Sequence, residues 1–202
     1  MTTTPWTADR PSRSPFAHPS GALGWLAGRV MLRANRQDDL IDLLDVREGD
    51  IVLEVGYGPG GLLRRLAATP AGRIDGVDPS EQMRRAAGRA NRAAVADGRI
   101  RLRVGAADDT GFAGGAFDRV VSVNTLAIWP DLDAGLAELH RVTRPGGRVV
   151  LAWHGGRHPS AIGRRLRLPG RHLDRVHDAL RDLFSEVVRH ELATLTAFTT
   201  TR

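Results

Sequence analysis

Short apolar runs alternate with amphipathic segments through most of this chain. Gly or Asp flanks most of these runs, and short apolar runs of this kind are typical of strands that are buried on both faces of a parallel sheet. The segments between the runs place apolar residues at helical spacing, as Leu132, Leu136 and Leu139 illustrate. The predicted strands cover residues 51–55, 73–77, 100–104, 118–123 and 148–153, and the predicted helices cover residues 60–68, 80–96, 132–142 and 172–184.

Repeated strand–helix units predict an α/β fold whose parallel strands are joined by right-handed crossovers. Two further apolar runs, 186–192 and 194–199, are joined by a tight turn and predict an antiparallel hairpin at the end of the chain. Near the start, residues 21–33 and 37–44 have the apolar spacing of helices. We therefore expect a seven-stranded, mostly parallel sheet with a terminal antiparallel hairpin and an N-terminal helical cap.

The turn after the first predicted strand is rich in glycine. Glycine leaves the backbone open to a ligand, and the helix that follows points free N–H groups at the same place. The spacing Gly56-x-Gly58-x-x-Gly61 fits a dinucleotide fingerprint, with Asp78 where a ribose-binding acid would stand. Glu54 instead favours S-adenosylmethionine, because a carboxylate suits an ammonium group and repels a pyrophosphate. The predicted sheet also contains only one mononucleotide-binding half, whereas a dinucleotide-binding fold has two, and this too favours S-adenosylmethionine.

Four motifs follow one another along the chain. They are Val-Leu-Glu-Val-Gly-Tyr-Gly-Pro-Gly (52–60), Gly-Val-Asp-Pro-Ser (76–80), Phe-Asp-Arg-Val-Val-Ser-Val-Asn (117–124) and Arg-Val-Thr-Arg-Pro-Gly-Gly-Arg-Val-Val-Leu (141–151). Together they resemble the class I S-adenosylmethionine-dependent methyltransferases of the small-molecule type. The resemblance implies a Rossmann-like fold and a methyltransferase domain that binds S-adenosylmethionine over residues 36–202. Residues 1–35 then form an arm and a helical cap, which resembles that of a bacterial subgroup.

The resemblance implies that the Gly56–Gly60 backbone passes under the methionyl part of the cofactor. Asp78 is placed to accept both ribose hydroxyls, the alternative being a helix N-cap. Met83 suits either the adenine or plain helix core, and Asn124 suits either the methionyl end or loop backbone. The residues expected to bind the cofactor are Glu54, Gly56, Tyr57, Gly58, Gly60, Asp78, Pro79, Met83, Ala106, Ala107, Asp108, Asn124 and Thr125.

The loop after the third predicted strand departs from the family pattern. Such families often show Gly-Asp-Ala, whose Asp takes the adenine amino group, whereas this chain has Ala106 at that position. Either the backbone of Ala106 and Ala107 holds the adenine, or Asp108 substitutes after a shift of the loop. The departure leaves a non-catalytic protein that binds S-adenosylmethionine as one alternative function.

On the acceptor side, His154 follows a predicted strand and is the candidate general base for a neutral acceptor. A single structural hydrogen bond is an equally good interpretation of this histidine. Trp129 would form an aromatic wall of the pocket, or else a hydrophobic anchor for helix 132–142. Met31 and Asn35 would line the acceptor if the cap resemblance holds.

The composition of the chain limits the classes of molecule that it is expected to bind. All 29 basic residues are Arg and 23 residues are acidic, so the formal charge is +6. Arginines are frequent between residues 157 and 175. We favour the interpretation that they form a solvent-exposed face over the alternative that they bind an anionic substrate. No aromatic residues interleave with them for stacking on bases, so nucleic acid is not expected. Cysteine is absent, no apolar run could span a membrane, and Gly155 and Gly156 argue against a metal site on His154 and His158.

The sequence therefore predicts a cytoplasmic enzyme, monomeric or homodimeric, with no metal and no secretory signal. It would transfer a methyl group in line from S-adenosylmethionine to a small-molecule acceptor, an anionic one being an option. The alternatives are an RNA methyltransferase, a non-catalytic cofactor-binding protein and an NAD(P)-dependent oxidoreductase.

Overall fold

The structure is a computed structural model, and it describes residues 4–7 and 38–202. The predicted helix 21–33 and the candidate residues Met31 and Asn35 lie outside these ranges. The strands are β1 (Ile51–Val55), β2 (Arg73–Asp78), β3 (Ile100–Val104), β4 (Phe117–Val123), β5 (Thr143–His154), β6 (Ser185–Glu191) and β7 (Leu195–Thr201). The helices are α2 (Asp38–Leu44), α3 (Gly61–Leu66), α4 (Glu81–Ala90), α5 (Arg92–Ala96), α6 (Leu132–Val142), α7 (Ala161–Leu166) and α8 (Gly170–Leu183), with a 3-10 turn η1 (Leu126–Ile128).

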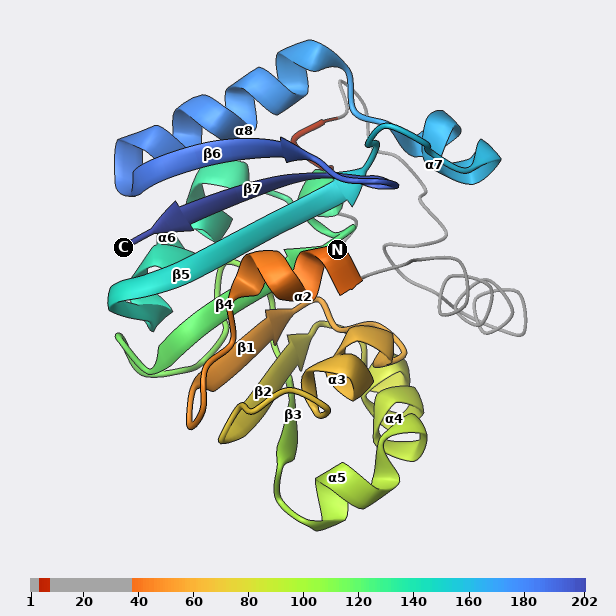
Figure 1. Ribbon diagram of the computed structural model, residues 1–202, viewed down its shortest axis with the longest axis vertical. Coiled ribbons are helices and arrows are strands. Elements are labelled where there is room, and N and C mark those ends of the chain that lie inside the picture. Colours follow the sequence, from red (N-terminus) through yellow and green to blue (C-terminus); the bar gives the residue numbers. More distant parts are fainter. Residues whose placement is uncertain (1–3, 8–37) are drawn as a thin grey trace.

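All seven strands form one sheet, in the order β3-β2-β1-β4-β5-β7-β6 (Figure 1). Strands β1 to β5 run parallel to one another, and β7 is antiparallel to both β5 and β6. The expected mostly parallel sheet with a terminal antiparallel hairpin is therefore confirmed. The reversal of strand order between β1 and β4 is the place where open α/β sheets bind ligands, at the carboxyl ends of the strands.

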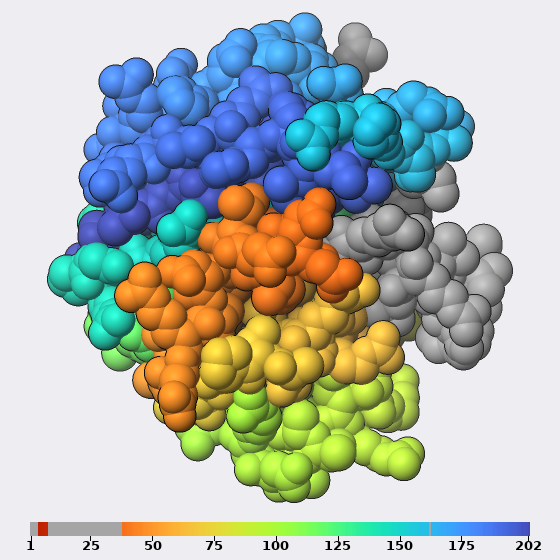
Figure 2. All heavy atoms as spheres, viewed as in Figure 1, coloured from red at the N-terminus to blue at the C-terminus, as the bar shows by residue number. Residues whose placement is uncertain are grey.

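Helices cover both faces of the sheet because successive strand residues point to opposite sides. Val52 belongs to a core that includes side chains of α2 and α3, whereas Leu53 belongs to a second core that includes side chains of α6 and α8. Figure 2 shows α2 (orange) and α3 (yellow) on the first face, with the blue strands β6 and β7 beside α2. The central strands are thus buried on both sides, as their continuous apolar runs predict.

Two elements differ from the sequence prediction, each because of a contact between distant residues. The predicted helix 80–96 breaks at Asn91, whose buried side-chain amide donates to the carbonyl oxygens of Gly60 and Ala87, both at 3.0 Å. Strand β5 begins at residue 143, five residues before the predicted start. It is extended there because Gly146 N donates to Arg202 O at 2.7 Å, at the end of β7.

Gly60 is the residue against which Asn91 packs, and its replacement should be costly. Its φ is 83°, and an added Cβ would lie 2.6 Å from Asn91 Nδ2. We expect Gly60→Ala to lower the free energy of unfolding by about 2–3 kcal/mol, through backbone strain and loss of the amide contact. Gly58→Ala is the matched control, since φ is 51° there and nothing lies within 4 Å of its Cβ position. Urea denaturation that gave equal losses would contradict this account.

Candidate functional site

Polar side chains gather where the parallel strands end. Glu54 lies near the end of β1, Asp78 ends β2, Asn124 follows β4 and His154 ends β5. The register pairs Glu54 with Val121 of β4, so these strand ends lie along a common edge of the sheet. What the edge can hold depends on which of their polar atoms remain free.

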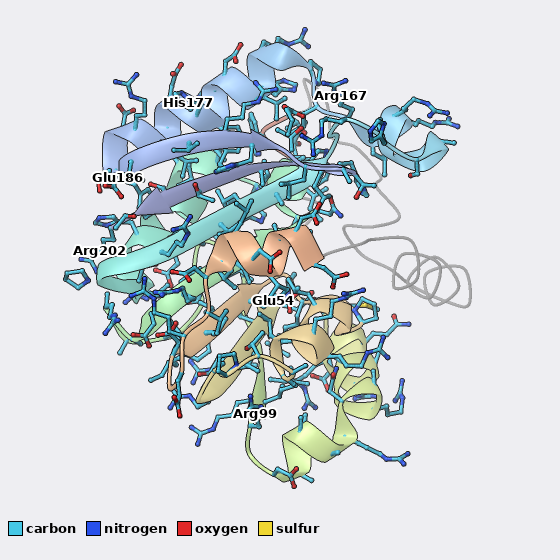
Figure 3. The ribbon with its side chains drawn as sticks, in the orientation of Figure 1. Glu54, Arg99, Arg167, His177, Glu186 and Arg202 are labelled. Atoms are coloured by element: carbon cyan, nitrogen blue, oxygen red, sulfur yellow. The ribbon has the colours of Figure 1, made fainter. Side chains whose placement is uncertain are left out.

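Glu54 is a buried carboxylate with a free oxygen. Its side chain is 3% exposed, and Oε2 has no hydrogen-bond partner among the described residues. Figure 3 shows Glu54, a residue of β1, just below α2 in this view. Burial raises the pKa of Glu54 well above 4.5, the charge of Asp78 adds to the rise, and a backbone hydrogen bond from Leu63 opposes it. A cationic donor bound at Oε2 would remove this cost.

Asp78 joins the glycine turn to the end of β2. Its Oδ2 accepts from Gly58 N and its Oδ1 accepts from Ser80 N, both at 2.9 Å. Burial raises the pKa of Asp78, and these two backbone hydrogen bonds act in the opposite direction. The N-cap of α4 is Ser80, whose Oγ accepts from Met83 N, so the alternative of Asp78 as the N-cap is wrong. Each carboxylate oxygen keeps further acceptor capacity for a ligand.

The glycine turn rests directly on the loop after β4. A Cβ at Gly56 would lie 2.3 Å from Thr125 Cγ2, so only glycine fits there without movement. Thr125 Oγ1 is hydrogen-bonded to Ser122 Oγ, which donates to Val55 O at 2.8 Å. Thr125 therefore positions Gly56, a role that sequence reasoning missed because the two residues are far apart in the chain. Gly58 is different, since its Cβ position faces open space.

Asn124 is the second residue with an unsatisfied buried acceptor. It has φ 58°, which is uncommon for a residue other than glycine, and its backbone N donates to Ala152 O at 2.8 Å. Its Oδ1 is buried and has no partner among the described residues. Buried acceptors without donors are rare in folded proteins, and strained backbone often accompanies function. Glu54 and Asn124 together mark this edge as a place that receives hydrogen-bond donors.

Tyr57 and Met83, which the sequence predicts to bind the cofactor, also pack within the protein core. Tyr57 is 3% exposed and its hydroxyl donates to Arg103 O at 3.2 Å. Its ring fills the space beside Gly76, where a Cβ would lie 2.7 Å from Cδ1. Met83 is half-buried against the same core, and Pro79 is exposed. Contacts of these three residues with the cofactor stay predictions.

The loop after β3 is closed by its own backbone. Ala106 N donates to Asp109 O at 3.1 Å, and Gly105 N donates to Asp78 O at 3.2 Å. Ala107 is half-buried against the core, and Asp108 is exposed. Because the Ala106 N–H already donates a hydrogen bond to Asp109 O, Ala107 and Asp108 are better candidates than Ala106 for a hydrogen bond to the adenine. Which of them is used stays a prediction.

Glu138 of α6 holds this loop in place, and sequence reasoning missed it. The carboxylate is 8% exposed; Oε1 accepts from Thr110 N and Oγ1, and Arg141 Nε donates to Oε2 at 2.6 Å. Burial raises the pKa of Glu138, but the hydrogen bonds from Arg141 and Thr110 outweigh it and lower that pKa. No local pattern could reveal this residue, because Thr110 lies 28 residues away.

Glu138→Gln should destabilise the protein, because the amide nitrogen that replaces Oε2 cannot accept the hydrogen bond from Arg141 Nε. We expect a loss of about 1–3 kcal/mol in the free energy of unfolding at pH 7. A lowered pKa makes this contribution present above the unfolded pKa, about 4.3, and lost as pH falls below it. Denaturant titrations at pH 7 and pH 3 check this. A difference between wild type and variant that persisted at pH 3 would contradict it.

Trp6 and Thr7 pack on the segment that follows β4. Trp6 Nε1 donates to Leu126 O at 2.7 Å, Trp6 N donates to Trp129 O at 3.1 Å, and Thr7 Oγ1 donates to Ala127 O at 2.8 Å. These bonds hold η1 and were not foreseen. Trp129 is 5% exposed and packs on α6, where a Cβ at Gly135 would be 2.5 Å from the indole ring. The packing fits the alternative of a helix anchor, and the pocket wall stays a prediction.

His154 is buried at the end of β5, with 9% of its surface exposed. Its ring meets that of Trp153 edge to face, with 5.6 Å between centroids. Burial lowers the pKa of His154 below 6.5, so the imidazole is neutral at pH 7 and able to accept a proton. Its role as a general base stays a prediction.

Metal ligands and membrane-spanning helices are absent from the described residues. In residues 4–7 and 38–202, no group of three or more His, Cys, Asp or Glu side chains is arranged to hold a metal ion. None of the helices in these ranges is both long and apolar enough to cross a membrane.

Comparison with known proteins identifies the family. Residues 52–147 match the family model described as a methyltransferase domain. The chain is 30% identical over 129 residues to a Bacillus subtilis protein named as an uncharacterized methyltransferase, YdaC, and the match covers 62% of this chain and 69% of that one. The chain belongs to the class I S-adenosylmethionine-dependent methyltransferases.

One more relative and one solved structure are similar to this methyltransferase. Nocamycin O-methyltransferase of Saccharothrix syringae is 39% identical over 114 residues, which cover 55% of this chain and 40% of the relative. The crystal structure of a SAM-dependent methyltransferase from Aquifex aeolicus has the same fold, with a TM-score of 0.69. That match has 16% sequence identity and covers 87% of this chain and 96% of the other.

The cofactor of this family is S-adenosylmethionine, and the edge of the sheet fits it. Glu54 Oε2 is a buried anion without a partner among the described residues, which suits an ammonium group. Gly58 offers a backbone surface that a side chain would fill. Asp78 has acceptor capacity left for hydroxyl groups, and Asn124 Oδ1 is a further acceptor in need of a donor. These residues are the ones that would hold the cofactor.

Proposed function

We propose that this methyltransferase transfers a methyl group, in line, from S-adenosylmethionine to a small-molecule acceptor. The observation that carries the proposal is the buried Oε2 of Glu54, which has no partner among the described residues, together with the open Cβ position at Gly58 in the turn that follows β1. The name of the nocamycin O-methyltransferase supports a small-molecule acceptor for this chain too. S-adenosylmethionine supplies a methyl group already activated on a sulfonium, so the protein's task is to bind, align and exclude water.

The chain's own residues would divide this work along the edge of the sheet. Glu54 holds the ammonium group, Asp78 the ribose hydroxyls, and Thr125 keeps Gly56 at its place in the turn. A neutral acceptor also has to lose a proton as the new bond to its oxygen or nitrogen forms. His154 is neutral at pH 7 and lies at the end of β5, beside β4, so it is the proposed acceptor of that proton.

Calorimetry with S-adenosylhomocysteine, followed by a screen of low-molecular-weight acceptors with labelled S-adenosylmethionine, tests the proposal. We expect binding and transfer of label to a small molecule. Absence of binding at millimolar cofactor would overturn it. Binding of NAD(P) in place of S-adenosylhomocysteine would indicate an oxidoreductase, binding without turnover a non-catalytic protein, and strongly salt-dependent RNA binding an RNA methyltransferase.

If His154 is the base, activity should depend on its protonation. The pKa of this histidine is lowered below 6.5 by burial, so kcat/KM should fall only when pH drops below 6.5. His154→Gln should reduce kcat by about 10²-fold or more and remove this acidic limb. If the variant kept both the wild-type rate and the acidic limb of the pH profile, a residue other than His154 would be the general base.

Arginines of the segment around α7 supply a reason to include anions in the acceptor screen. Arg164, Arg165 and Arg167 are exposed and follow the end of β5 in the chain. In the described part of the protein none of the three forms an ion pair with an acidic side chain. We propose carboxylates and phosphates as the first acceptors to try. Neutral acceptors that reacted faster would leave these arginines as a solvated face.

A further inference from the structure

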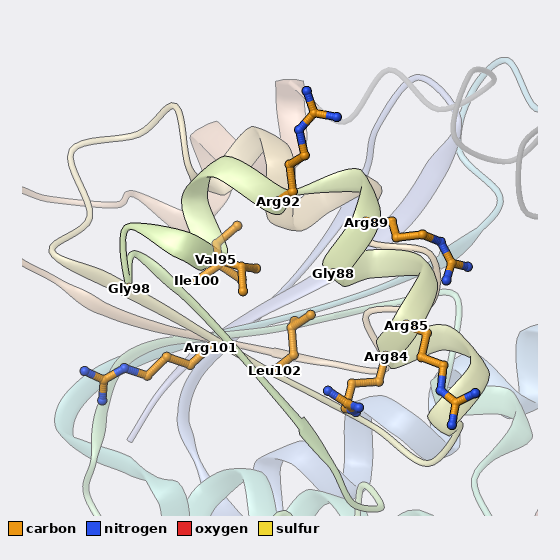
Figure 4. A pocket seen from close by; sticks show the side chains of 10 residues that line it. All are labelled: Arg84, Arg85, Gly88, Arg89, Arg92, Val95, Gly98, Ile100, Arg101 and Leu102. Carbon is orange, nitrogen blue, oxygen red and sulfur yellow. The ribbon is translucent and has the colours of Figure 1, made fainter.

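A concave surface lies between α4, α5 and β3 (Figure 4). Its volume is about 760 Å³. The arginine groove, as we call it, takes its name from five lining arginines: Arg84, Arg85, Arg89, Arg92 and Arg101. Within the described residues, no acidic side chain lines it. The groove contains none of the residues assigned above to the cofactor or acceptor.

The centre of the arginine groove is aliphatic. Val95 of α5 and Ile100 and Leu102 of β3 lie close together there, with the arginines around them, as Figure 4 shows. Ile100 is 1% exposed and so forms the floor, while Leu102 and Val95 are half-buried. A ligand that filled the groove would bury aliphatic surface and meet guanidinium groups around it.

The charge on the rim is only partly neutralised. Arg84 and Arg85 share one partner, Glu81, at 2.7 and 3.0 Å. Arg89, Arg92 and Arg101 are exposed, and no acidic side chain among the described residues forms an ion pair with them. Guanidinium groups bind carboxylates and phosphates through paired charge-assisted hydrogen bonds. The rim therefore selects an anionic ligand.

Strand β3 adds a third feature. It is the outermost strand at its end of the sheet and, in the part of the chain described, pairs only with β2. Val104 continues the row of Ile100 and Leu102 along β3 and is 45% exposed. An outer strand presents backbone donors and acceptors to an extended chain, which alternates its side chains between two faces.

We propose that the arginine groove docks an acidic polypeptide segment in which apolar side chains alternate with carboxylates. Apolar side chains on the α4/α5 side of the added strand would cover Ile100, Leu102 and Val104, and carboxylates on its other side would meet Arg101. Carboxylates that flank this stretch would meet Arg89 and Arg92 on the helices. Single-stranded nucleic acid fits less well, since no aromatic side chain among the described residues lines the groove. A membrane fits less well, because the apolar floor is recessed behind the arginines. A second copy of this chain would bring a net charge of +6 to a cationic surface.

Binding of a labelled peptide of about ten residues, with alternating Glu and Leu, tests the proposal on the full-length protein. Replacement of Leu by Ser in the peptide should weaken binding about tenfold, and replacement of Glu by Lys should abolish it. The groove variant Arg89→Glu, Arg92→Glu, Arg101→Glu should also weaken binding at least about tenfold. The matched control, Arg64→Glu, Arg171→Glu, Arg181→Glu, has the same charge change on exposed residues and should bind within about twofold.

NMR of the 15N-labelled wild type maps the contact without any variant that might fail to fold. Shift changes confined to residues 84–104 support the proposal. Equal losses in the two triple variants, a Ser peptide as good as the Leu peptide, or shifts spread over α7 would overturn it. So would tighter binding of single-stranded RNA in the groove. The outcome is independent of methyl transfer, since no cofactor is present in the experiment.

Discussion

Glu54→Gln should make the cofactor-free protein more stable while it weakens S-adenosylmethionine binding about 100-fold. The affinity falls because the amide no longer pairs with the ligand's ammonium. The stability rises because a neutral amide costs less to bury than a carboxylate whose Oε2 has no partner among the described residues. We expect a gain on the order of 1–3 kcal/mol in the free energy of unfolding at pH 8. Urea denaturation and calorimetry with S-adenosylhomocysteine measure the two effects.

The pH dependence of stability separates this account from a general packing effect. The pKa of Glu54 is raised in the folded protein, so the wild type loses stability as pH rises from about 4.3 through that raised pKa. The variant lacks this loss, and the two stability curves should meet below about pH 4.3 and diverge above it. Glu138→Gln is the control, because its pKa is lowered and its effect has the opposite sign. A Glu54→Gln protein less stable than wild type at pH 8 would refute the prediction.

Asp78→Asn should weaken S-adenosylmethionine binding about 100-fold and change stability by less than about 1 kcal/mol. Both carboxylate oxygens of Asp78 accept backbone hydrogen bonds and remain able to accept ribose hydroxyls, whereas an amide offers one oxygen and one donor. Stability changes little because the loss of one backbone hydrogen bond is offset by the lower cost of burying an uncharged amide, since burial is what raises the pKa of Asp78. Calorimetry and thermal unfolding of the same preparation check both halves.

Asp75→Asn is the matched control on the same strand. Asp75 is 4% exposed and accepts from Arg73 Nε at 2.8 Å, three residues before Asp78. The variant loses this ion pair, so we expect a stability loss of about 1 kcal/mol with unchanged affinity for the cofactor. Equal effects of the two substitutions on affinity would show that Asp78 acts through the sheet and not on the ligand.

The parts of this fold that the sequence predicts are those whose information is local. The run from Ile51 to Val55 and the glycines after it specify a strand and a turn over a few residues. Glu54 and Asp78 could be placed at one edge because parallel strands bring their carboxyl ends together. The residues expected to bind S-adenosylmethionine therefore lie in short stretches whose structure the local sequence specifies.

The parts that sequence reasoning missed depend on contacts between distant segments. The break at Asn91 follows from its bond to Gly60, 31 residues away, and Glu138 holds a loop 28 residues away. Trp6 holds η1 from 120 residues away. No spacing pattern records such pairs, because each partner is an ordinary residue in its own neighbourhood. Met31 and Asn35 lie outside the described residues, so the acceptor side rests on fewer observations.

The contact between Gly56 and Thr125 makes the two loops one packing unit. A Cβ at position 56 has no room unless residue 125 moves, and Thr125 is tied through Ser122 to the carbonyl of Val55. The glycine turn after β1 and the loop after β4 therefore cannot be replaced independently of each other. Swapping the segment after β4 to obtain a new acceptor preference would require residues 122–125 to be kept, while residues further along remain open to exchange.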